Sequence, residues 1–257
     1  MKINRSLFTS ILLSGLMLTN VSCAADSDKG PQAKDLDQRW TSVLDGAQIT
    51  EVRPSPINGI WEVQAGPHIF YTNEAGDKLI IGDIITMEKD APVNLTEQER
   101  GQARLATIKA LNPEDFIVYA AKKPKHNLYV FTDADCVYCR KFHEQRQELM
   151  DAGITINYIA MPRTPPGSPS YKKSVAIWCA KDRQAAFNEA VKDELKDVET
   201  SCEAGEKIVA ADVTLARNFG VSGTPALIFE DGTLVPGFLP AAELINYFDE
   251  QDKASSK

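Results

Sequence analysis

The sequence has no surplus of positive charge and, beyond its N-terminus, no long apolar run. Lys and Arg contribute 28 residues against 36 from Asp and Glu, for a formal net charge of -8. A surface that binds nucleic-acid phosphates needs an excess of basic residues, so this balance argues against a nucleic-acid partner. No segment after residue 25 approaches the roughly 20 apolar residues of a membrane-spanning helix. What remains, 43% hydrophobic and 25% charged residues, is typical of a soluble globular protein.

The N-terminus has the pattern of a secretory signal peptide. Lys2 and Arg5 precede an apolar stretch from Leu7 to Leu18, which is too short to cross a bilayer and is followed by small residues. We expect residues 1–25 to be removed. The mature protein is then exported to a compartment where disulfides persist.

Five cysteines have to be accounted for. Cys23 lies at the expected cleavage site and is lost with the signal peptide; lipid modification is the alternative, although residues 20–22 lack the Leu usually found three positions before a lipidated cysteine. Four cysteines remain in the mature chain: Cys136, Cys139, Cys179 and Cys202. An even set in an exported protein indicates two bridges.

A Cys-X-X-Cys motif runs from Cys136 to Cys139. It stands between a buried-strand pattern over residues 127–131 and a helical pattern that continues to Asp151. A first cysteine at a helix N-terminus faces unsatisfied backbone N–H groups and the positive end of the helix dipole, which stabilise a thiolate. The second cysteine lies one turn further on, where it can attack the first sulfur. The context predicts a pair that makes and breaks disulfides.

The neighbours of the motif leave several alternatives open. Asp135 should disfavour a thiolate at Cys136 and Arg140 should favour it, unless both are simply solvated. Tyr138 and Phe142 either offer apolar surface to an unfolded client or pack inside the protein.

A zinc site at the motif would need two more ligands at short spacing, and the other cysteines are distant. His143 follows Cys139 by four positions but has no second His nearby. We interpret His143 as a helix-surface residue, with a direct catalytic role as the alternative. No metal ion and no cofactor are expected.

Thr224-Pro225 precedes an apolar strand pattern, residues 226–229. Proline lacks the donor that a strand ladder needs, so it marks a conformational boundary. In a thioredoxin fold such a proline is cis, and its loop faces the cysteine pair. The backbone of Thr224 would then pair with an extended client segment. The alternative is an ordinary trans proline at the end of a loop.

Cys179 and Cys202 lie in or beside helical patterns with apolar neighbours. We expect them to form a structural disulfide, which chain entropy would make worth roughly 3 kcal/mol. A second redox pair is the alternative.

The first third of the mature chain predicts a small antiparallel sheet with one leading helix. The helix covers residues 36–44 and ends at Asp45-Gly46, and four strands follow over residues 49–53, 60–64, 68–72 and 78–86, with a hairpin turn at 73–77. A unit this small has a marginal core, so pairing with a second copy through an edge strand is plausible.

A capping-box pattern beginning at Thr96 opens a polar helix that runs to about Leu111 and stops at Asn112-Pro113. Its sparse apolar stripe is typical of a connector between domains. Beyond it follow the active-site strand and helix, an alternating strand over 154–159, helices over 170–180, 182–195 and 205–219, a hairpin over 226–235, and a closing helix over 241–250. This order predicts a thioredoxin fold with a helical insertion.

Several motifs in this order resemble those of the periplasmic protein-disulfide isomerases of the DsbC/DsbG family, and DsbC more than DsbG. They extend over nearly the whole mature chain and lie at residues 91–96, 117–119, 131–133, 136–139, 143–145, 153–155, 176–182, 220–225 and 232–237. The stretches 91–96 and 117–119 match the linker region of the family.

The resemblance implies a signal peptide over 1–25, a cystatin-like N-terminal dimerisation domain over 26–94, a linker helix over 95–113 and a thioredoxin-fold catalytic domain over 114–257. It implies a periplasmic, V-shaped homodimer whose uncharged cleft receives misfolded exported proteins. It also implies that a membrane reductant of the DsbD type keeps the active cysteine pair reduced. By motif match, Cys136 is the nucleophile, Cys139 the resolving cysteine, Pro225 the cis proline, and Cys179–Cys202 the structural bridge.

One position departs from the family pattern. DsbC-like members usually carry Gly-Tyr between the active cysteines and DsbG-like members Pro-Tyr, whereas this chain has Val137-Tyr138. Because that dipeptide tunes thiolate stability, we expect it to affect the balance of isomerase, reductase and oxidase activity. The main alternatives are a chaperone-like binding module with secondary redox activity and a dithiol oxidase.

Overall fold

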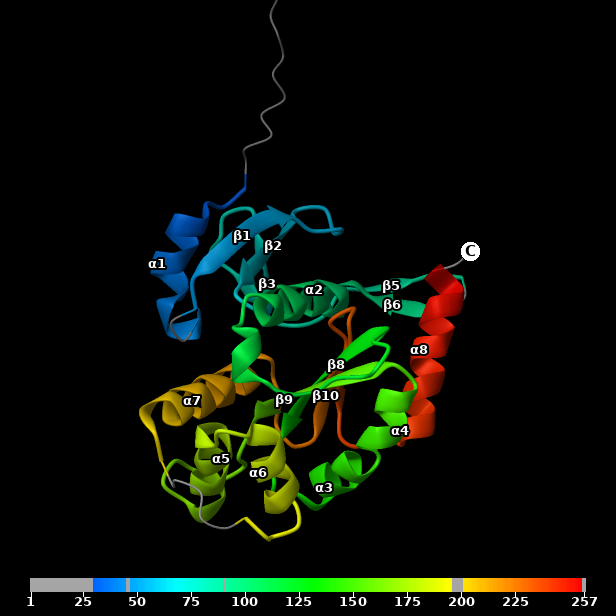
Figure 1. The fold of residues 1–257 in the computed structure, drawn as a ribbon. Helices are drawn as coiled ribbons and strands as arrows, with labels where there is room; N and C mark the ends of the chain where they lie inside the picture. Colours follow the sequence, from blue (N-terminus) through cyan, green and yellow to red (C-terminus); the bar gives the residue numbers. More distant parts are fainter. Residues whose placement is uncertain (1–29, 45–46, 90, 196–200, 256–257) are drawn as a thin grey trace, which may run out of the picture.

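The structure, a computed structural model, describes residues 30–44, 47–89, 91–195 and 201–255 (Figure 1). The expected signal peptide, Cys23 and the Asp45-Gly46 helix stop lie outside these residues. None of the helices within them is both long enough and apolar enough to cross a membrane.

The N-terminal unit is one helix packed on a four-stranded antiparallel sheet with strand order β1-β2-β3-β4. The elements are α1 (Ala33–Leu44), β1 (Ile49–Pro54), β2 (Ile60–Ala65), β3 (His68–Asn73) and β4 (Leu79–Ile80). Its small core consists of five buried side chains from α1 and β2: Leu36, Trp40, Leu44, Val63 and Ala65. The sheet and its leading helix therefore match the sequence-based expectation.

The single strand predicted over residues 78–86 is wrong. β4 ends at Ile80, and β5 (Ile85–Met87) pairs instead with β6 (Pro92–Asn94) in a separate two-stranded sheet. Between the two strands the Ile84 N–H donates to the hydroxyl of Thr96, 2.8 Å away, which holds this segment against the start of the next helix.

The next helix, α2 (Leu95–Lys109), begins two positions earlier than the capping-box prediction, which makes Thr96 the N-cap. Its cap is Asn94, whose side chain accepts from the Glu97 N–H at 2.9 Å. Thr96 is fully buried in the first turn, where it bonds to the Tyr71 hydroxyl at 2.5 Å as well as to Ile84. Its hydroxyl is thus used by tertiary contacts rather than by the helix end.

The C-terminal unit is built on a five-stranded sheet with order β11-β10-β8-β9-β7. Its strands are β7 (Ile117–Tyr119), β8 (His126–Thr132), β9 (Ile154–Ala160), β10 (Ala226–Ile228) and β11 (Leu234–Pro236). Only β8 and β9 run parallel among these pairs. Residues 117–119, matched above to a linker region, instead form the edge strand of this sheet.

A short 3-10 helix, η1 (Pro113–Asp115), leads into β7. The remaining helices are α3 (Val137–Glu144), α4 (Arg146–Asp151), α5 (Pro169–Cys179), α6 (Arg183–Ala190), α7 (Glu203–Asn218) and α8 (Ala241–Ser255). All seven residues of β9 are buried because the strand lies inside the sheet with packed side chains on both faces. The strand predicted over residues 154–159 is confirmed, and burial on both faces covers its polar residues Thr155 and Asn157 as well.

The single helix predicted from the active-site motif to Asp151 is two helices. The break is at Gln145, whose side chain donates to the Leu239 carbonyl and accepts from the Ala241 N–H, both at 2.8 Å. Gln145 thereby caps the start of α8 and fixes the active-site helix against the C-terminal helix.

Helix α2 lies between the two units (Figure 1) and contacts the second through the turn before β11. Gly101 and Gly232 meet backbone to backbone, and a Cβ on Gly232 would lie 1.9 Å from the Gly101 oxygen. The buried Arg104 donates to the Gly232 carbonyl at 2.9 Å, and Ile108 packs in the core beneath α7. The connector helix is therefore packed on the second unit despite its sparse apolar stripe.

We predict that Gly232→Ala destabilises the protein through this contact. Gly232 has a φ of +83°, so any Cβ costs about 1 kcal/mol in backbone conformation, and separating the two backbones should cost about 2 kcal/mol more. Gly220→Ala is the matched control, since Gly220 has a φ of +74° and open space around its Cβ position. Denaturant unfolding of the two variants measures the difference; equal losses would contradict the packing argument.

Candidate active site

Cys136 occupies the N-cap position of α3, directly after β8 and a short turn. Its N–H donates to the Asp133 carbonyl at 3.0 Å, which closes the turn, and its carbonyl accepts from the Arg140 N–H at 3.0 Å. Cys139 lies one helical turn further on. Both cysteines are free thiols and both are almost fully covered, at 3% and 1% exposure.

Thr224-Pro225 is brought against this turn from the far end of the chain. The peptide bond between them is cis, and the Cys136 thiol donates to the Thr224 carbonyl at 3.2 Å. The Pro225 carbonyl accepts from the Gly237 N–H at 2.9 Å, which anchors the loop to the end of β11. The structure thus brings together the cysteine pair and the proline that the sequence singled out.

The pKa values of the two thiols are shifted in opposite directions. Burial opposes ionisation of Cys136, but hydrogen bonds from Thr224, from Cys139 and from the Tyr138 N–H outweigh it and lower the Cys136 pKa. Burial raises the pKa of Cys139 to about 12, against smaller opposing effects of the Asp133 N–H and of two threonine hydroxyls. Cys136 is therefore the thiol suited to act as nucleophile, since thiolates rather than thiols attack disulfides.

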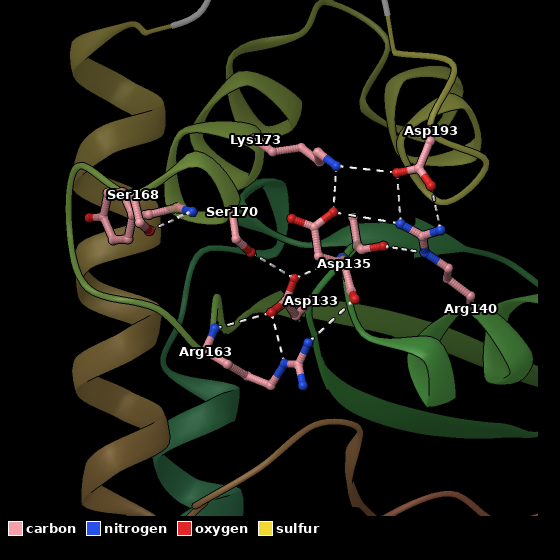
Figure 2. Close-up of polar contacts among 10 residues, drawn as sticks. Asp133, Asp135, Arg140, Arg163, Ser168, Ser170, Lys173 and Asp193 are labelled. Atoms are coloured by element: carbon pink, nitrogen blue, oxygen red, sulfur yellow. Dashed lines mark hydrogen bonds and ion pairs between the residues drawn. The ribbon is translucent and has the colours of Figure 1, made fainter.

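A network of four charged side chains surrounds the start of α3 (Figure 2). Asp135 forms a close ion pair with Lys173 of α5 and lies 3.6 Å from Arg140. Arg140 in turn donates two hydrogen bonds, of 2.6 and 2.8 Å, to the carboxylate of Asp193. Lys173 also reaches Asp193 at 3.4 Å. Neither Asp135 nor Arg140 is simply solvated, and the negative charge beside Cys136 is compensated within the network.

The carboxylate of Asp133 is a buried hub that the sequence analysis did not single out as a site residue. It accepts from the Asp135 N–H at 2.8 Å, from the backbone and side chain of Arg163 at 3.1 and 3.0 Å, and from the Ser170 hydroxyl at 3.1 Å (Figure 2). It ties the turn before Cys136 to the segment after β9 and to α5. An acidic residue three positions before the first cysteine was the available signal.

The apolar side chains within and just after the motif differ in exposure. Val137 and Tyr138 are 64% and 56% exposed, and the Tyr138 ring lies 6.3 Å from that of Phe238. Phe142 is fully buried in the core, so of the two alternatives left open for it, packing inside the protein is the one that holds. The difference follows from helical spacing, because position 142 lies on the face of α3 that packs on the sheet.

The interpretation of His143 as a surface residue is also wrong, since the ring is 3% exposed. Its Nε2 lies 2.7 Å from the Asn188 side-chain oxygen and its Nδ1 lies 3.1 Å from the Tyr158 hydroxyl. An oxygen opposite Nε2 requires the proton there, so Nδ1 accepts from Tyr158. Through these two hydrogen bonds the neutral ring connects α3 to α6 and β9.

Cys179 at the end of α5 and Cys202 at the N-cap of α7 form a disulfide, with sulfurs 2.12 Å and Cα atoms 5.7 Å apart. The bridge ties together helices α5 and α7 of the insertion.

Comparison with known proteins relates both units to one family. Residues 113–252 match the model of a thioredoxin-like domain, and residues 23–97 match the model of the disulfide bond isomerase N-terminal domain. The thiol:disulfide interchange protein DsbC of Escherichia coli K12 is 36% identical over 225 residues, covering 88% of this chain and 92% of that protein. This chain belongs to the DsbC family.

The DsbC of Dickeya dadantii is 38% identical over 213 residues, covering 82% of this chain and 85% of that protein. Among solved structures, a linker-deletion mutant of Proteus mirabilis ScsC aligns with a TM-score of 0.51 at 21% identity, covering 62% of this chain and 85% of that one. At 21% identity, the similarity to ScsC concerns the fold alone. Membership of the DsbC family confirms the predicted pairing of an N-terminal unit with a thioredoxin-like domain.

We predict that Lys173→Met raises the Cys136 pKa in this DsbC-family site. The substitution removes the closest cation from Asp135, and the uncompensated carboxylate then disfavours a neighbouring thiolate. The rate of Cys136 alkylation as a function of pH reports the change, because Cys139 titrates far higher. Lys207→Met, which breaks the exposed pair with Glu203 on α7, is the control and should leave the profile unmoved.

We also predict that His143 makes stability depend on pH. Burial lowers its pKa from 6.5 to about 4, although the bond to Asn188 opposes the shift. The unfolded chain takes up the proton first, so the stabilisation is complete above pH 6.5 and is lost as the pH falls towards 4.

His143→Gln should reduce the loss of stability as the pH falls from 6.5 to about 4, as measured by denaturant unfolding across that range. Asp212 has the opposite effect, because burial raises its pKa to about 7 and stability is lost as pH rises. The informative quantity is therefore the difference between variant and parent. If the stability of the two proteins changed equally with pH, the assignment of His143 as a buried neutral ring would be contradicted.

Proposed function

We propose that the chain is a protein disulfide isomerase and reductase that acts on exported proteins through Cys136. The observation that carries the proposal is the contact of the Cys136 thiol, at a helix N-terminus, with the carbonyl that precedes cis-Pro225. Family membership supports the same chemistry.

In the first step the Cys136 thiolate attacks one sulfur of a wrongly paired client disulfide. The bond from Cys136 to that sulfur forms, the client S–S bond breaks, and the departing client thiolate takes the electron pair. A client thiolate then attacks the client sulfur held in the mixed disulfide, which forms a new client bond and returns Cys136 to its reduced state. The net result is isomerisation without change in oxidation state.

In the second route Cys139 attacks the Cys136 sulfur of a mixed disulfide that is not rearranged. The client leaves reduced and the enzyme is left with a Cys136–Cys139 bond, so an external reductant is required. We propose a membrane thiol reductant of the DsbD type for this purpose. The high pKa of Cys139 delays this route and gives the client time to rearrange.

We propose that the client segment lies along Thr224 and Pro225, with Tyr138 beside it. The cis peptide presents the backbone of Thr224 next to the nucleophile, so an extended client strand can pair there while its disulfide meets Cys136. The exposed side chains of Val137 and Tyr138 supply apolar contact at the same end of α3.

The active form proposed is a homodimer joined through the N-terminal units. Four large apolar side chains on or near β4 and β5 are exposed by 45–80%: Ile80, Ile81, Ile85 and Met87. β4 is an edge strand of its sheet, and an apolar edge is a ready pairing surface. We further propose the domain division 26–94, 95–113 and 114–257, export to the periplasm by a cleaved signal peptide, and loss of Cys23 with it.

We predict distinct consequences for the two active-site cysteines. Cys136→Ser should reduce the refolding of a scrambled, disulfide-rich client to the uncatalysed rate, because no nucleophile remains. Cys139→Ser should accumulate mixed disulfides with the client, seen as reducible adducts on a gel. Catalysis retained by Cys136→Ser would refute the isomerase proposal.

A double Cys136→Ser, Cys139→Ser variant separates the chaperone-like alternative. If it prevents client aggregation as well as the parent and the parent shows no disulfide turnover, client binding is the main activity.

A further inference from the structure

Asp193 lies just past the end of α6 in a backbone conformation that favours glycine. Its φ is +59°, and within the described residues it is the one residue other than glycine with a positive φ. The Asp193 N–H donates to the Ala190 carbonyl at 3.1 Å. The next N–H, that of Glu194, donates to the Glu189 carbonyl at 2.9 Å. In this type of helix ending the left-handed residue is usually glycine, because a Cβ is crowded there. The side chain at position 193 is therefore present against a backbone cost.

The charge of Asp193 is unfavourable at the same place. The last carbonyls of a helix carry partial negative charge, which disfavours a carboxylate. The compensation comes from two other helices: Arg140 of α3 donates bonds of 2.6 and 2.8 Å, and Lys173 of α5 lies 3.4 Å away. These contacts, the Arg140 bonds most of all, lower the pKa of Asp193. A local cost that is offset by contacts to the helix beginning at Cys136 indicates a role at the active site.

Asp193 and Asp135 compete for the same two cations. Figure 2 shows the four side chains as a closed ring, in the order Asp135, Lys173, Asp193 and Arg140. The Arg140 Nε donates to the Ala134 carbonyl at 2.8 Å, so the two terminal nitrogens are left for the carboxylates. Both of them are bonded to Asp193, whereas Asp135 lies 3.6 Å away. Asp193 thus takes the larger share of the Arg140 charge.

We propose that Asp193 is a positioning residue for the redox chemistry of Cys136: it holds the Arg140 guanidinium away from Asp135 and so makes the Cys136 thiolate less stable. The inference rests on the proposed function, in which Cys136 is the nucleophile. Without the carboxylate at position 193, the ring has two cations against one anion. Arg140 then turns to Asp135, the carboxylate that remains in the ring. Both changes favour negative charge on the neighbouring sulfur.

The stability of this thiolate decides how readily the cysteine pair is reduced. In the reaction with glutathione, two glutathione thiols lose two electrons and two protons and form their disulfide. The Cys136–Cys139 bond takes up the two electrons and two protons and becomes two thiols. A more stable Cys136 thiolate stabilises the reduced pair and makes its disulfide a stronger oxidant. Asp193 therefore favours isomerase and reductase chemistry over oxidation.

Titratable and charged groups reach the two ends of this linkage from several elements. Asp193 is faced by Arg140 of α3 and Lys173 of α5, and it is flanked in the chain by Lys192 and Glu194. The groups around Cys136 lie on its own turn, on α3 and after β9: Asp133, Asp135, Cys139, Arg140 and Arg163. Asp133 and Arg163 pair with each other outside the ring, so a change at position 193 leaves that pair in place.

The test compares the full-length mature parent with Asp193→Asn, Asp193→Gly and Glu194→Gln. Asn removes the charge at nearly the same shape and tolerates the left-handed backbone, and Gly fits that backbone best. Glu194→Gln is the matched control, because it removes the same charge at the next residue, outside the ring. Two quantities are measured. They are the rate of Cys136 alkylation as a function of pH, and the equilibrium of the cysteine pair with reduced and oxidised glutathione, followed by gel shift of the trapped thiols.

We expect both Asp193 variants to move the midpoint of the alkylation profile down by about 0.3 to 0.7 pH units, the effect of one partly exposed ion pair. The glutathione equilibrium should shift about two- to fivefold towards the reduced pair, and both changes should shrink in about 1 M salt. Glu194→Gln should keep the parent values. In an Arg140→Gln background Asp193→Asn should change neither quantity, because the proposed effect passes through Arg140.

An unchanged profile and equilibrium in folded Asp193 variants would overturn the proposal and leave Asp193 as a structural tie, which denaturant unfolding alone would report. An equal shift in Glu194→Gln, or a shift that persists in the Arg140→Gln background, would also overturn it, because surface charge would then explain the effect. A parent whose cysteine pair does not exchange with glutathione would instead overturn the proposed function. The two failures are therefore distinguishable.

Discussion

The proposed chemistry depends on the contact between the Cys136 thiol and the Thr224 carbonyl, 88 residues apart in the chain. On one side of this contact is the N-terminus of α3, whose free N–H groups favour a thiolate. On the other is the cis-proline loop, which we propose as the binding site for a client strand. The antiparallel pairing of β8 with β10 brings the two sides together, because the start of β10 lies beside the carboxyl end of β8.

Burial divides the cysteine pair into two unequal thiols. At Cys136 the hydrogen-bond donors outweigh the effect of burial, so its pKa falls, whereas at Cys139 the effect of burial outweighs the donors and its pKa rises. A low pKa suits a first attack, and a high one delays resolution. An isomerase requires that delay, because the client must rearrange before it is released.

Charge around the site is arranged so that no carboxylate near Cys136 stands alone. Asp135 is compensated by Lys173 and Arg140, and Asp133 by Arg163. Two of these partners, Arg163 and Lys173, come from other parts of the chain, and so does Asp193, which pairs with Arg140. The helical insertion thus contributes electrostatically to the active-site turn, in addition to covering the sheet.

The sequence alone determined the thioredoxin-type fold, the cysteine pair at a helix start, the proline before the final hairpin and the family. These features are local or depend on composition: periodicity, caps and short motifs are written in neighbouring residues. Only the tertiary structure decided the burial of His143 and Phe142, the capping of α2 by Asn94 rather than Thr96, and the break at Gln145. Each of those outcomes depends on a partner from a distant segment. Periodicity within one helix does not identify Tyr158, Tyr71 or Leu239 as such a partner, because their proximity follows from how the sheets and helices pack.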